Sequence, residues 1–319
     1  MADGGEGTLD AFEAAVPGAV RMPLRVVGPD GRPVDAEWLQ LPDGTAVVEL
    51  ALASGITLLD PLLPFDANTY GFGQLIAAAL DTGATSLILA VGGSSSTDGG
   101  AGALAALGAG LFDAAGTPIP LGNRGLASLE RADLTTARVA PANVVVLCDV
   151  HNPLLGPDGA AAIFGPQKGA APTDIRALDA NLARFAAVVG GDPAVAGAGA
   201  AGGAAYGLVA WGAQLSSGAE AIAARSGLDE AIRSADLVIT GEGRFDSQSL
   251  AGKIPHHIAS VANELNVDVA LVAGLIEAPT TQFAHAVSLT EIAGGSASAR
   301  ANAERWLEVA GAQLAARMR

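Results

Sequence analysis

The segment Asp236–Lys253, which reads DLVITGEGRFDSQSLAGK, concentrates acids, bases, hydroxyl groups and glycines. Its apolar start, Leu237–Ile239, predicts a strand that runs into a glycine-punctuated loop ahead of a helix. Proteins of the α/β class present polar groups in this way at the carboxyl ends of their strands, and glycines let the backbone approach a phosphate closely. The segment therefore predicts a phosphate or substrate site, with an ordinary turn between strand and helix as the alternative.

A second glycine-rich loop follows the apolar run Leu87–Val91 and precedes a helix-like stretch. Its N–H and O–H groups suit an anion, and Asp98 within it could hold a metal ion or cap the next helix. The candidate phosphate ligands are Gly92, Gly93, Ser94, Ser95, Thr97, Gly99 and Gly100. The loop has neither the Gly-Lys-Ser/Thr ending of a Walker A motif nor a clean dinucleotide fingerprint. A flexible linker is disfavoured because a strand and a helix flank the loop.

Oxygen ligands for a metal ion follow a third strand-like run, Val144–Leu147. Asp149 and Asn152 both supply oxygen atoms, which suit Mg²⁺. A turn built by Asn152 and the proline after it is an equal alternative. Lys168, on a loop rich in glycine and proline, could reach a phosphate or remain a solvated surface charge.

The chain starts with an acidic glycine loop, Asp3–Thr8, ahead of the helix-like stretch Leu9–Val16. A loop of this kind normally follows a strand. No strand precedes it here, so the sheet is expected to lack one element at this point.

The composition fits a soluble, cytoplasmic enzyme. A length of 319 residues favours two domains. The net charge of −16, from 17 basic and 33 acidic residues, disfavours nucleic acid and anionic membranes as partners. The single cysteine, Cys148, excludes an internal disulfide and favours a reducing compartment. No apolar run reaches the roughly eighteen residues of a membrane helix, and the acidic start differs from a signal peptide.

These motifs together resemble the bacterial-type glycerate kinases, and they occur in that family's order over nearly the whole chain. The matching stretches are ADGGEGT (Ala2–Thr8), TYGFGQLI (Thr69–Ile76), GGSSSTDGGAG (Gly92–Gly102), DVHNPLLG (Asp149–Gly156), FGPQKGA (Phe164–Ala170), GAGAAGG (Gly197–Gly203), VITGEGRFDSQSLAGK (Val238–Lys253) and SLTE (Ser288–Glu291). The resemblance implies phosphorylation of D-glycerate by ATP with Mg²⁺. Members of the family usually begin earlier, with a strand and an Asp-Ser-Phe-Lys-Gly motif that this sequence does not contain.

The resemblance also implies an α/β fold with one flavodoxin-like domain and one mixed α/β domain. We expect residues 1–20 and 226–319 to form the flavodoxin-like domain and residues 21–225 to form the other. Arg21–Val27, Glu37–Leu41 and Val47–Leu50 predict antiparallel strands joined by Pro-Asp-Gly turns. The active site is expected in the cleft between the domains, where ligands often bind.

Phosphoryl transfer needs positioned groups and charge neutralisation, and the residues can be assigned accordingly. Asp246 is the first choice for the general base and Asp3 the second, and Lys253 is expected to stabilise the transferring phosphoryl group. Arg244 suits the carboxylate of glycerate. The expected substrate ligands also include Glu6, Gln248 and Ser249; phosphates would contact Gly92–Gly100, Lys168, Gly241 and Gly243; and Asp149 with Asn152, or Asp98, would hold Mg²⁺.

Other functions remain open at this stage. One is a protein that binds a nucleotide or an acid sugar without transferring phosphate, because the usual first strand is missing. Another is a different small-molecule kinase or a dehydrogenase, although the absence of a dinucleotide fingerprint weakens the dehydrogenase. Both 2- and 3-phosphoglycerate are open as products, and so is the oligomeric state.

Overall fold

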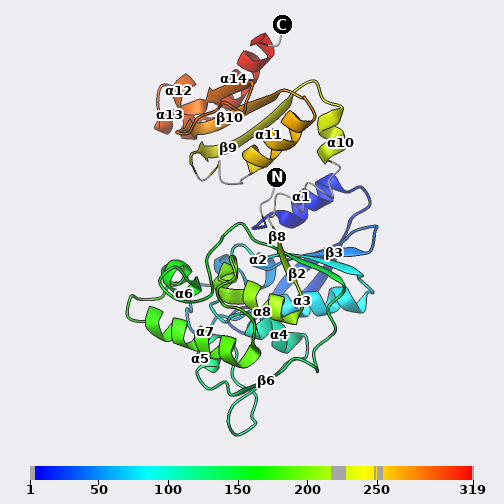
Figure 1. Ribbon diagram of the computed structural model, residues 1–319, viewed down its shortest axis with the longest axis vertical. Coiled ribbons are helices and arrows are strands. Elements are labelled where there is room, and N and C mark those ends of the chain that lie inside the picture. The colour runs from blue at the N-terminus through cyan, green and yellow to red at the C-terminus, as the bar shows by residue number, and fades with distance from the viewer. Residues whose placement is uncertain (1–3, 217–227, 248, 250–253, 318–319) are drawn as a thin grey trace. The chain divides into compact units, whose positions relative to one another are not determined.

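The computed structural model describes residues 4–216, 228–247, 249 and 254–317 (Figure 1). The chain divides into two compact units, a larger one of residues 2–221 and a smaller one of residues 222–319. Residues 8–20 thus belong to the larger unit, whereas the sequence led us to expect residues 1–20 in the flavodoxin-like domain. The reason is local, because helix α1 (Thr8–Ala15) packs against the second and third strands of the larger unit.

The larger unit combines one main sheet with helices on its faces. Its elements are α1 (Thr8–Ala15), β1 (Val20–Val27), β2 (Pro33–Gln40), β3 (Thr45–Glu49), α2 (Ala51–Ser54), η1 (Ile56–Leu58), α3 (Tyr70–Asp81), β4 (Ser86–Ala90), α4 (Ala101–Ala106), β5 (Gly110–Phe112), α5 (Asn123–Leu126), β6 (Arg131–Asp133), β7 (Asn143–Leu147), α6 (Ala160–Phe164), η2 (Pro166–Lys168), α7 (Ile175–Val189), η3 (Ala200–Gly203), α8 (Ala204–Trp211) and β8 (Gln214–Ser216).

The main sheet has the strand order β1-β2-β3-β4-β7-β8 and is of mixed direction. β1, β2 and β3 pair antiparallel, as their Pro-Asp-Gly turns predicted, and β3, β4, β7 and β8 pair parallel. β3 joins the two parts, so the antiparallel strands extend the parallel sheet and do not form a separate one. Residues at the carboxyl ends of the parallel strands lie in one row, with Glu49 opposite Ala90 and Ala90 opposite Leu147.

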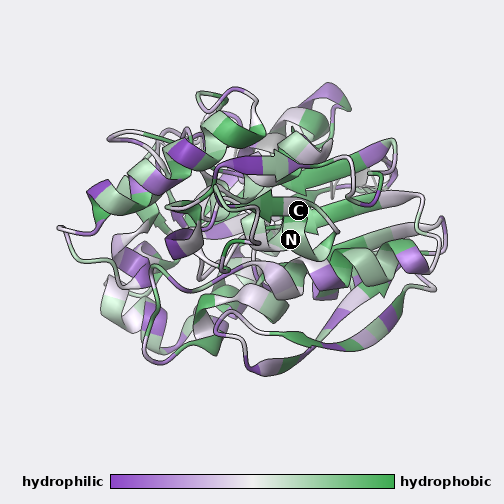
Figure 2. Cartoon of the chain, turned by 90° about the horizontal axis from the view of Figure 1, so that it is seen from below, coloured by the Kyte–Doolittle hydropathy of each residue, from purple (hydrophilic) through white to green (hydrophobic). Residues whose placement is uncertain are grey.

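Apolar strands and amphipathic helices create the core of this unit. β4 is buried from Leu87 to Ala90 because helices cover it, and its continuous apolar sequence is typical of a central parallel strand. α3 packs on α4 and α4 packs on α8, and Phe72, Leu104 and Leu208 are buried between these helices and the sheet. Figure 2 shows hydrophobic and hydrophilic residues alternating along the helices, as this packing requires.

The smaller unit is a parallel sheet with helices on both faces. Its elements are α10 (Leu228–Arg233), β9 (Val238–Phe245), α11 (Ile254–Glu264), β10 (Val269–Ile276), β11 (His285–Ser288), α12 (Leu289–Ile292), α13 (Ser296–Ala301) and α14 (Ala303–Arg317), and the strand order is β11-β10-β9. Val269 and Leu271 of β10 pack with α10 and α11, while Ala270 between them packs with α12, α13 and α14. The strand is therefore buried on both sides, which confirms the α/β class.

The C-terminal helical segment of the smaller unit is divided in two. α13 and α14 meet at Asn302, whose φ of −138° is not helical. On α14, Leu314 is buried, whereas Leu307 is 50% exposed. Within the described residues, no helix has the length and apolar character that crossing a membrane requires.

Candidate functional site

A cavity of about 370 Å³ lies at the carboxyl edge of the parallel strands in the larger unit. The segment after β4 and the segment after β7 form two of its walls, because parallel strands place the loops that follow them at the same edge. The residues that line it are Gly4, Gly5, Ile56, Val91, Gly92, Gly93, Ser94, Leu147, Cys148, Asp149, Val150, Phe164, Gln167, Lys168, Ala200 and Ala201. Five of the predicted site residues are among them: Gly92, Gly93, Ser94, Asp149 and Lys168.

The remainder of the Gly92–Gly100 loop lies beneath the cavity and supports it. Ser95, Thr97, Gly99 and Gly100 are buried and absent from the lining of the cavity. Ser95 donates both its hydroxyl group and its backbone N–H to the carbonyl oxygen of Ser54, at 2.8 and 3.0 Å. The φ angles of Gly99 and Gly100 are +68° and +82°, which favour glycine. These residues therefore shape the loop, and only its first part is open to a ligand in the cavity.

Asp98 caps a helix in this structure. Its side chain is fully buried and accepts hydrogen bonds from the N–H and hydroxyl groups of Thr69, at 2.9 and 2.8 Å. It also accepts from the N–H groups of Gly100 and Gly102, at 3.1 and 3.2 Å, where α4 begins. Four donors already surround the carboxylate, so of the two roles predicted for Asp98 the structure favours the cap over the metal ligand.

Lys168 brings a positive group to the cavity. The side chain is 2% exposed, and its Nζ donates to the carbonyl oxygen of Ser96 at 2.5 Å. Burial lowers the pKa of the lysine to about 7, against the attraction of Asp98. An anion in the cavity would favour the charged form of Lys168 and would thus be bound more tightly. The alternative prediction of a solvated surface charge is therefore wrong.

Asp149 and Asn152 lie on the loop after β7 but differ in position. Asp149 is exposed and lines the cavity. Asn152 does not line it; its Nδ2 donates to the carbonyl oxygen of Asp158 at 2.9 Å, so its amide group helps to build the loop. Over the residues that the structure describes, no three His, Cys, Asp or Glu side chains come together as a metal site. Of the three predicted metal ligands, Asp98, Asp149 and Asn152, Asp149 alone lines the cavity.

The acidic loop at the start of the chain forms a further wall. Gly4 and Gly5 line the cavity, and the carbonyl oxygen of Gly4 accepts from the N–H of Gly92 at 2.9 Å. Glu6 is exposed next to Gly93, since its Oε1 lies 3.1 Å from where a Cβ on Gly93 would be. Asp3, the second candidate for the base, lies outside the described residues.

The predicted residues of the smaller unit gather at the end of β9. Arg244 donates from Nε and Nη2 to Oε2 of Glu277, at 2.8 and 2.5 Å, and its Nε lies 3.7 Å from Oδ2 of Asp246. Ser249 is buried and donates its N–H to the carbonyl oxygen of Asp246 at 3.1 Å. Gln248 and Lys253 lie outside the described residues. Arg244 and Asp246 are thus neighbours at the end of β9.

The prediction of a loop at Gly241–Gly243 is wrong, because β9 continues to Phe245. Gly241 pairs with Val272 in the sheet, and a Cβ on it would lie 2.2 Å from the carbonyl oxygen of Val272. Gly241, Gly243 and Arg244 border a second cavity, of about 930 Å³, whose other lining residues are mostly apolar. The cavity of the larger unit fits phosphate chemistry better, since Lys168 and Asp149 converge there.

Two residues of interest, Glu49 and Ala201, were not predicted from the sequence. Glu49 ends β3, is buried and borders a separate small cavity together with Glu6; its sequence signal was an acid that terminates the apolar run Ala46–Val48. Ala201 lines the cavity with a φ of +54°, which an alanine gives no reason to expect. Cys148 also lines the cavity, and burial raises the pKa of its thiol.

Comparison with known proteins gives one consistent result. A family model described as "Glycerate kinase family" matches residues 1–319. Glycerate 2-kinase of Escherichia coli is 45% identical over 288 residues, which are 86% of this chain and 74% of that protein. Glycerate kinase of Bacillus subtilis is 42% identical over 289 residues, with 86% and 75% covered. A crystal structure of a protein assigned as glycerate kinase 2 from Salmonella typhimurium LT2 has a TM-score of 0.81 and 40% identity, and covers 90% of this chain and 79% of that one.

Proposed function

The chain belongs to the glycerate kinase family, and from this premise we propose that it transfers the γ-phosphoryl group of ATP to a hydroxyl group of D-glycerate. The hydroxyl oxygen forms a bond to the γ-phosphorus and loses its proton, the bond between this phosphorus and the β,γ-bridging oxygen breaks, and the products are ADP and phosphoglycerate. One observation carries the proposal: Gly92, Gly93, Ser94, Asp149 and Lys168 converge on one cavity.

The first part of the loop after β4 is proposed to bind phosphate oxygens. Glycines allow close approach of the backbone, and the hydroxyl group of Ser94 can donate a hydrogen bond. Lys168 is proposed to neutralise charge on the transferring phosphoryl group, because a cation in a buried site stabilises developing negative charge more strongly than it would in water.

Mg²⁺ is the proposed metal ion, with Asp149 as its protein ligand. Bound to the phosphates of ATP, it would supply neutralisation of their negative charge. The four hydrogen bonds that Asp98 accepts favour Asp149 over Asp98 for this role.

Arg244 and Asp246 keep their proposed roles on the side of the acceptor. Arg244 would pair with the carboxylate of glycerate in place of Glu277, since a guanidinium group forms bidentate bonds with carboxylates. Asp246 would remove the proton from the attacking hydroxyl group. Its link to Ser249 fixes the backbone that carries it.

The test is the release of ADP by the full chain from Mg-ATP, with and without D-glycerate, and ³¹P NMR of the product. Release that depends on glycerate, together with a new phosphomonoester signal, is expected. A folded chain that binds ATP and glycerate but releases no ADP would contradict the proposed transfer. The position of the new signal would also distinguish 2- from 3-phosphoglycerate.

A further inference from the structure

Glu49 has no part in the proposed chemistry, yet it is a buried charge at the carboxyl end of β3, on a separate small cavity that Glu6 also lines. The residue ends β3 opposite Ala90 and is 3% exposed. Within the described parts of the chain, the buried charged side chains are Glu49, Asp98 and Lys168. Burial raises the pKa of the Glu49 carboxyl group, and backbone hydrogen bonds oppose this shift. A buried carboxylate needs such partners, because water no longer solvates it.

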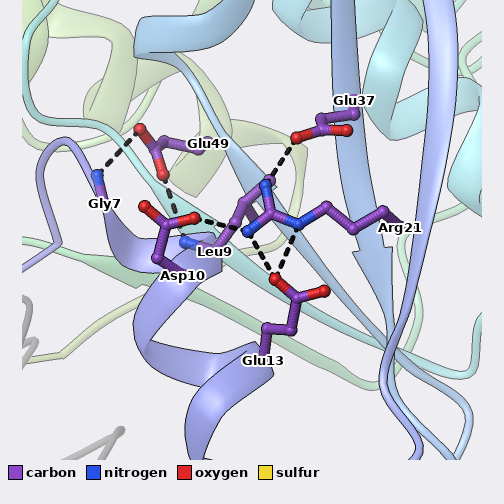
Figure 3. A network of polar contacts seen from close by, with 7 residues as sticks. All are labelled: Gly7, Leu9, Asp10, Glu13, Arg21, Glu37 and Glu49. Carbon is purple, nitrogen blue, oxygen red and sulfur yellow. Dashed lines mark hydrogen bonds and ion pairs between the residues drawn. The ribbon is translucent and has the colours of Figure 1, made fainter.

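Both oxygens of Glu49 hold the beginning of α1 (Figure 3). Oε1 accepts from the N–H of Gly7 and Oε2 from the N–H of Leu9, each at 3.2 Å. The first N–H groups of a helix have no partner within the helix, and the N-cap residue here is Gly7, which has no side chain to accept them. Glu49 supplies the missing acceptor from another strand, with a charge that complements the helix dipole.

The turn that Glu49 holds continues directly into the wall of the cavity. A Cβ on Gly4 would lie 2.8 Å from Cβ of Leu147, and a Cβ on Gly92 would lie 2.5 Å from Cα of Gly5. The loop is thus in close contact with the ends of β4 and β7. Its carbonyl oxygen at Gly5 also accepts from the hydroxyl group of Thr8 at 2.7 Å.

A second network of ion pairs, around Arg21, contacts α1 itself and makes no hydrogen bond to Gly7 or Leu9, which Glu49 holds. Arg21 donates to Asp10, Glu13 and Glu37, as Figure 3 shows. Glu13 stands on the same helix as the anchored turn, but it accepts hydrogen bonds from the side chain of Arg21 on β1. Glu13 therefore offers a matched control: its removal alters the packing of α1 without removing an acceptor from the loop.

We propose that Glu49 is a positioning residue, which fixes the Gly4–Gly7 loop against the ends of β4 and β7 so that Glu6 can bind glycerate. The identity of the substrate rests on the proposed function. A carboxylate accepts hydrogen bonds and cannot donate them when ionised, so Glu6 suits the hydroxyl groups of glycerate and not the phosphates of ATP. Loosening the loop should therefore weaken the binding of glycerate selectively.

The experiment compares the wild-type chain with Glu49→Ala and Glu13→Ala. Amide hydrogen exchange of residues 4–9 reports the anchoring, and steady-state kinetics report the two substrates. In Glu49→Ala, exchange at Gly7 and Leu9 should become at least about tenfold faster. The KM for glycerate should rise about tenfold, while the KM for ATP changes less than about twofold. Both measurements should stay within about twofold of wild type in Glu13→Ala.

Three results would overturn the proposal: unchanged exchange at Gly7 and Leu9, an unchanged KM for glycerate, or an equal rise in both KM values. If Glu49→Ala does not fold, Glu49→Gln decides, because glutamine keeps the shape and one acceptor oxygen; its exchange and KM should lie between those of wild type and the values predicted for alanine. A wild-type chain without kinase activity would refute the proposed function instead. The exchange measurement needs no turnover, so it would still decide whether Glu49 anchors the loop.

Discussion

Nζ of Lys168 lies 2.5 Å from the carbonyl oxygen of Ser96, and this contact joins η2 to the loop that follows β4. Lys168 and the glycine-rich loop reach the cavity from different segments of the chain. The hydrogen bond between them therefore fixes the position of the lysine relative to Gly92 and Gly93. The Lys168 side chain is almost completely buried. A strongly desolvated amine of this kind stabilises a protein poorly but binds an anion well.

Replacing Lys168 by methionine should separate these two effects. Lys168→Met is expected to lower kcat about 10²- to 10³-fold, the usual effect of removing one group that stabilises the transition state. The melting temperature should not fall, because an apolar side chain of similar length is buried without a desolvation cost. Arg25→Met, at a side chain that is 69% exposed, serves as the control for loss of one positive charge. Turnover close to wild type in Lys168→Met would remove this residue from the site.

The binding of ATP should take up protons near neutral pH. Burial lowers the pKa of Lys168 to about 7, so at about pH 8 most molecules carry the neutral amine. A bound phosphate raises this pKa and draws a proton from the solvent. Calorimetric titration in two buffers of different ionisation enthalpy should detect uptake at about pH 8 and little at about pH 5.5. Lys168→Met should abolish the uptake, and equal heats in both buffers for the wild type would argue against contact with phosphate.

Asp98 and Asp149 should respond oppositely to substitution. Asp98→Ala leaves buried donors of Thr69, Gly100 and Gly102 without an acceptor, which should cost at least about 3 kcal/mol of unfolding free energy. Asp149→Ala, at an exposed side chain, should cost less of that free energy than Asp98→Ala but raise the Mg²⁺ concentration for half-maximal activity about tenfold. Denaturant unfolding and a Mg²⁺ titration measure the two quantities. The proposed metal role would be wrong if Asp149→Ala left the Mg²⁺ dependence unchanged.

Glu49 should make stability fall as the pH rises from acid to neutral. Its folded pKa is raised by burial, with a contribution from the like charge of Asp10, so the folded state binds the proton more tightly than the unfolded state. The stability due to this proton is therefore fully present below the unfolded pKa of about 4.3 and is lost as the pH passes through the higher folded pKa. The difference in unfolding free energy between wild type and Glu49→Gln should decline from about pH 4 to about pH 7. A difference that is constant or rises would contradict the raised pKa.

Asp246→Asn should lower kcat by about 10²- to 10⁴-fold if Asp246 is the general base. Asparagine keeps the Oδ1 atom that faces the N–H of Ser249, so the melting temperature should remain close to that of wild type. Asp236→Asn is the control, because Asp236 is an exposed acid before the same strand. Equal turnover in both variants would assign the proton transfer to another group.

The strands that lead to the site could be predicted, because β4 and β7 are apolar runs, each followed two residues later by a candidate ligand, Gly92 or Asp149. Their common edge followed from the rule for parallel strands, and Gly92, Gly93, Ser94, Asp149 and Lys168 do meet there. The extension of β9 through Gly241 and Gly243 could not be predicted from propensity. Glycine weakens a strand intrinsically, and here the pairing with β10 outweighs that preference.

The roles within the Gly92–Gly100 loop also required the structure. A sequence shows that Ser94 and Ser95 carry hydroxyl groups, but it does not show which hydroxyl is already hydrogen-bonded within the protein. The Ser95 hydroxyl donates to the carbonyl oxygen of Ser54, 41 residues away in the sequence. Glu49 was missed for the same reason, since its partners Gly7 and Leu9 come about forty residues earlier and no local pattern links them.

Glycines and alanines make up much of the cavity wall, at Gly4, Gly5, Gly92, Gly93 and Ala201, and this restricts how the enzyme could be re-engineered. A substitution at Gly4 or Gly92 would collide with neighbouring chain before it reached a ligand. In a library of variants made to accept new acceptor molecules, most substitutions at these two glycines would therefore cause misfolding. Substitutions are better made at Ile56, Phe164 and Gln167, whose side chains already border the cavity and can be exchanged without moving the backbone.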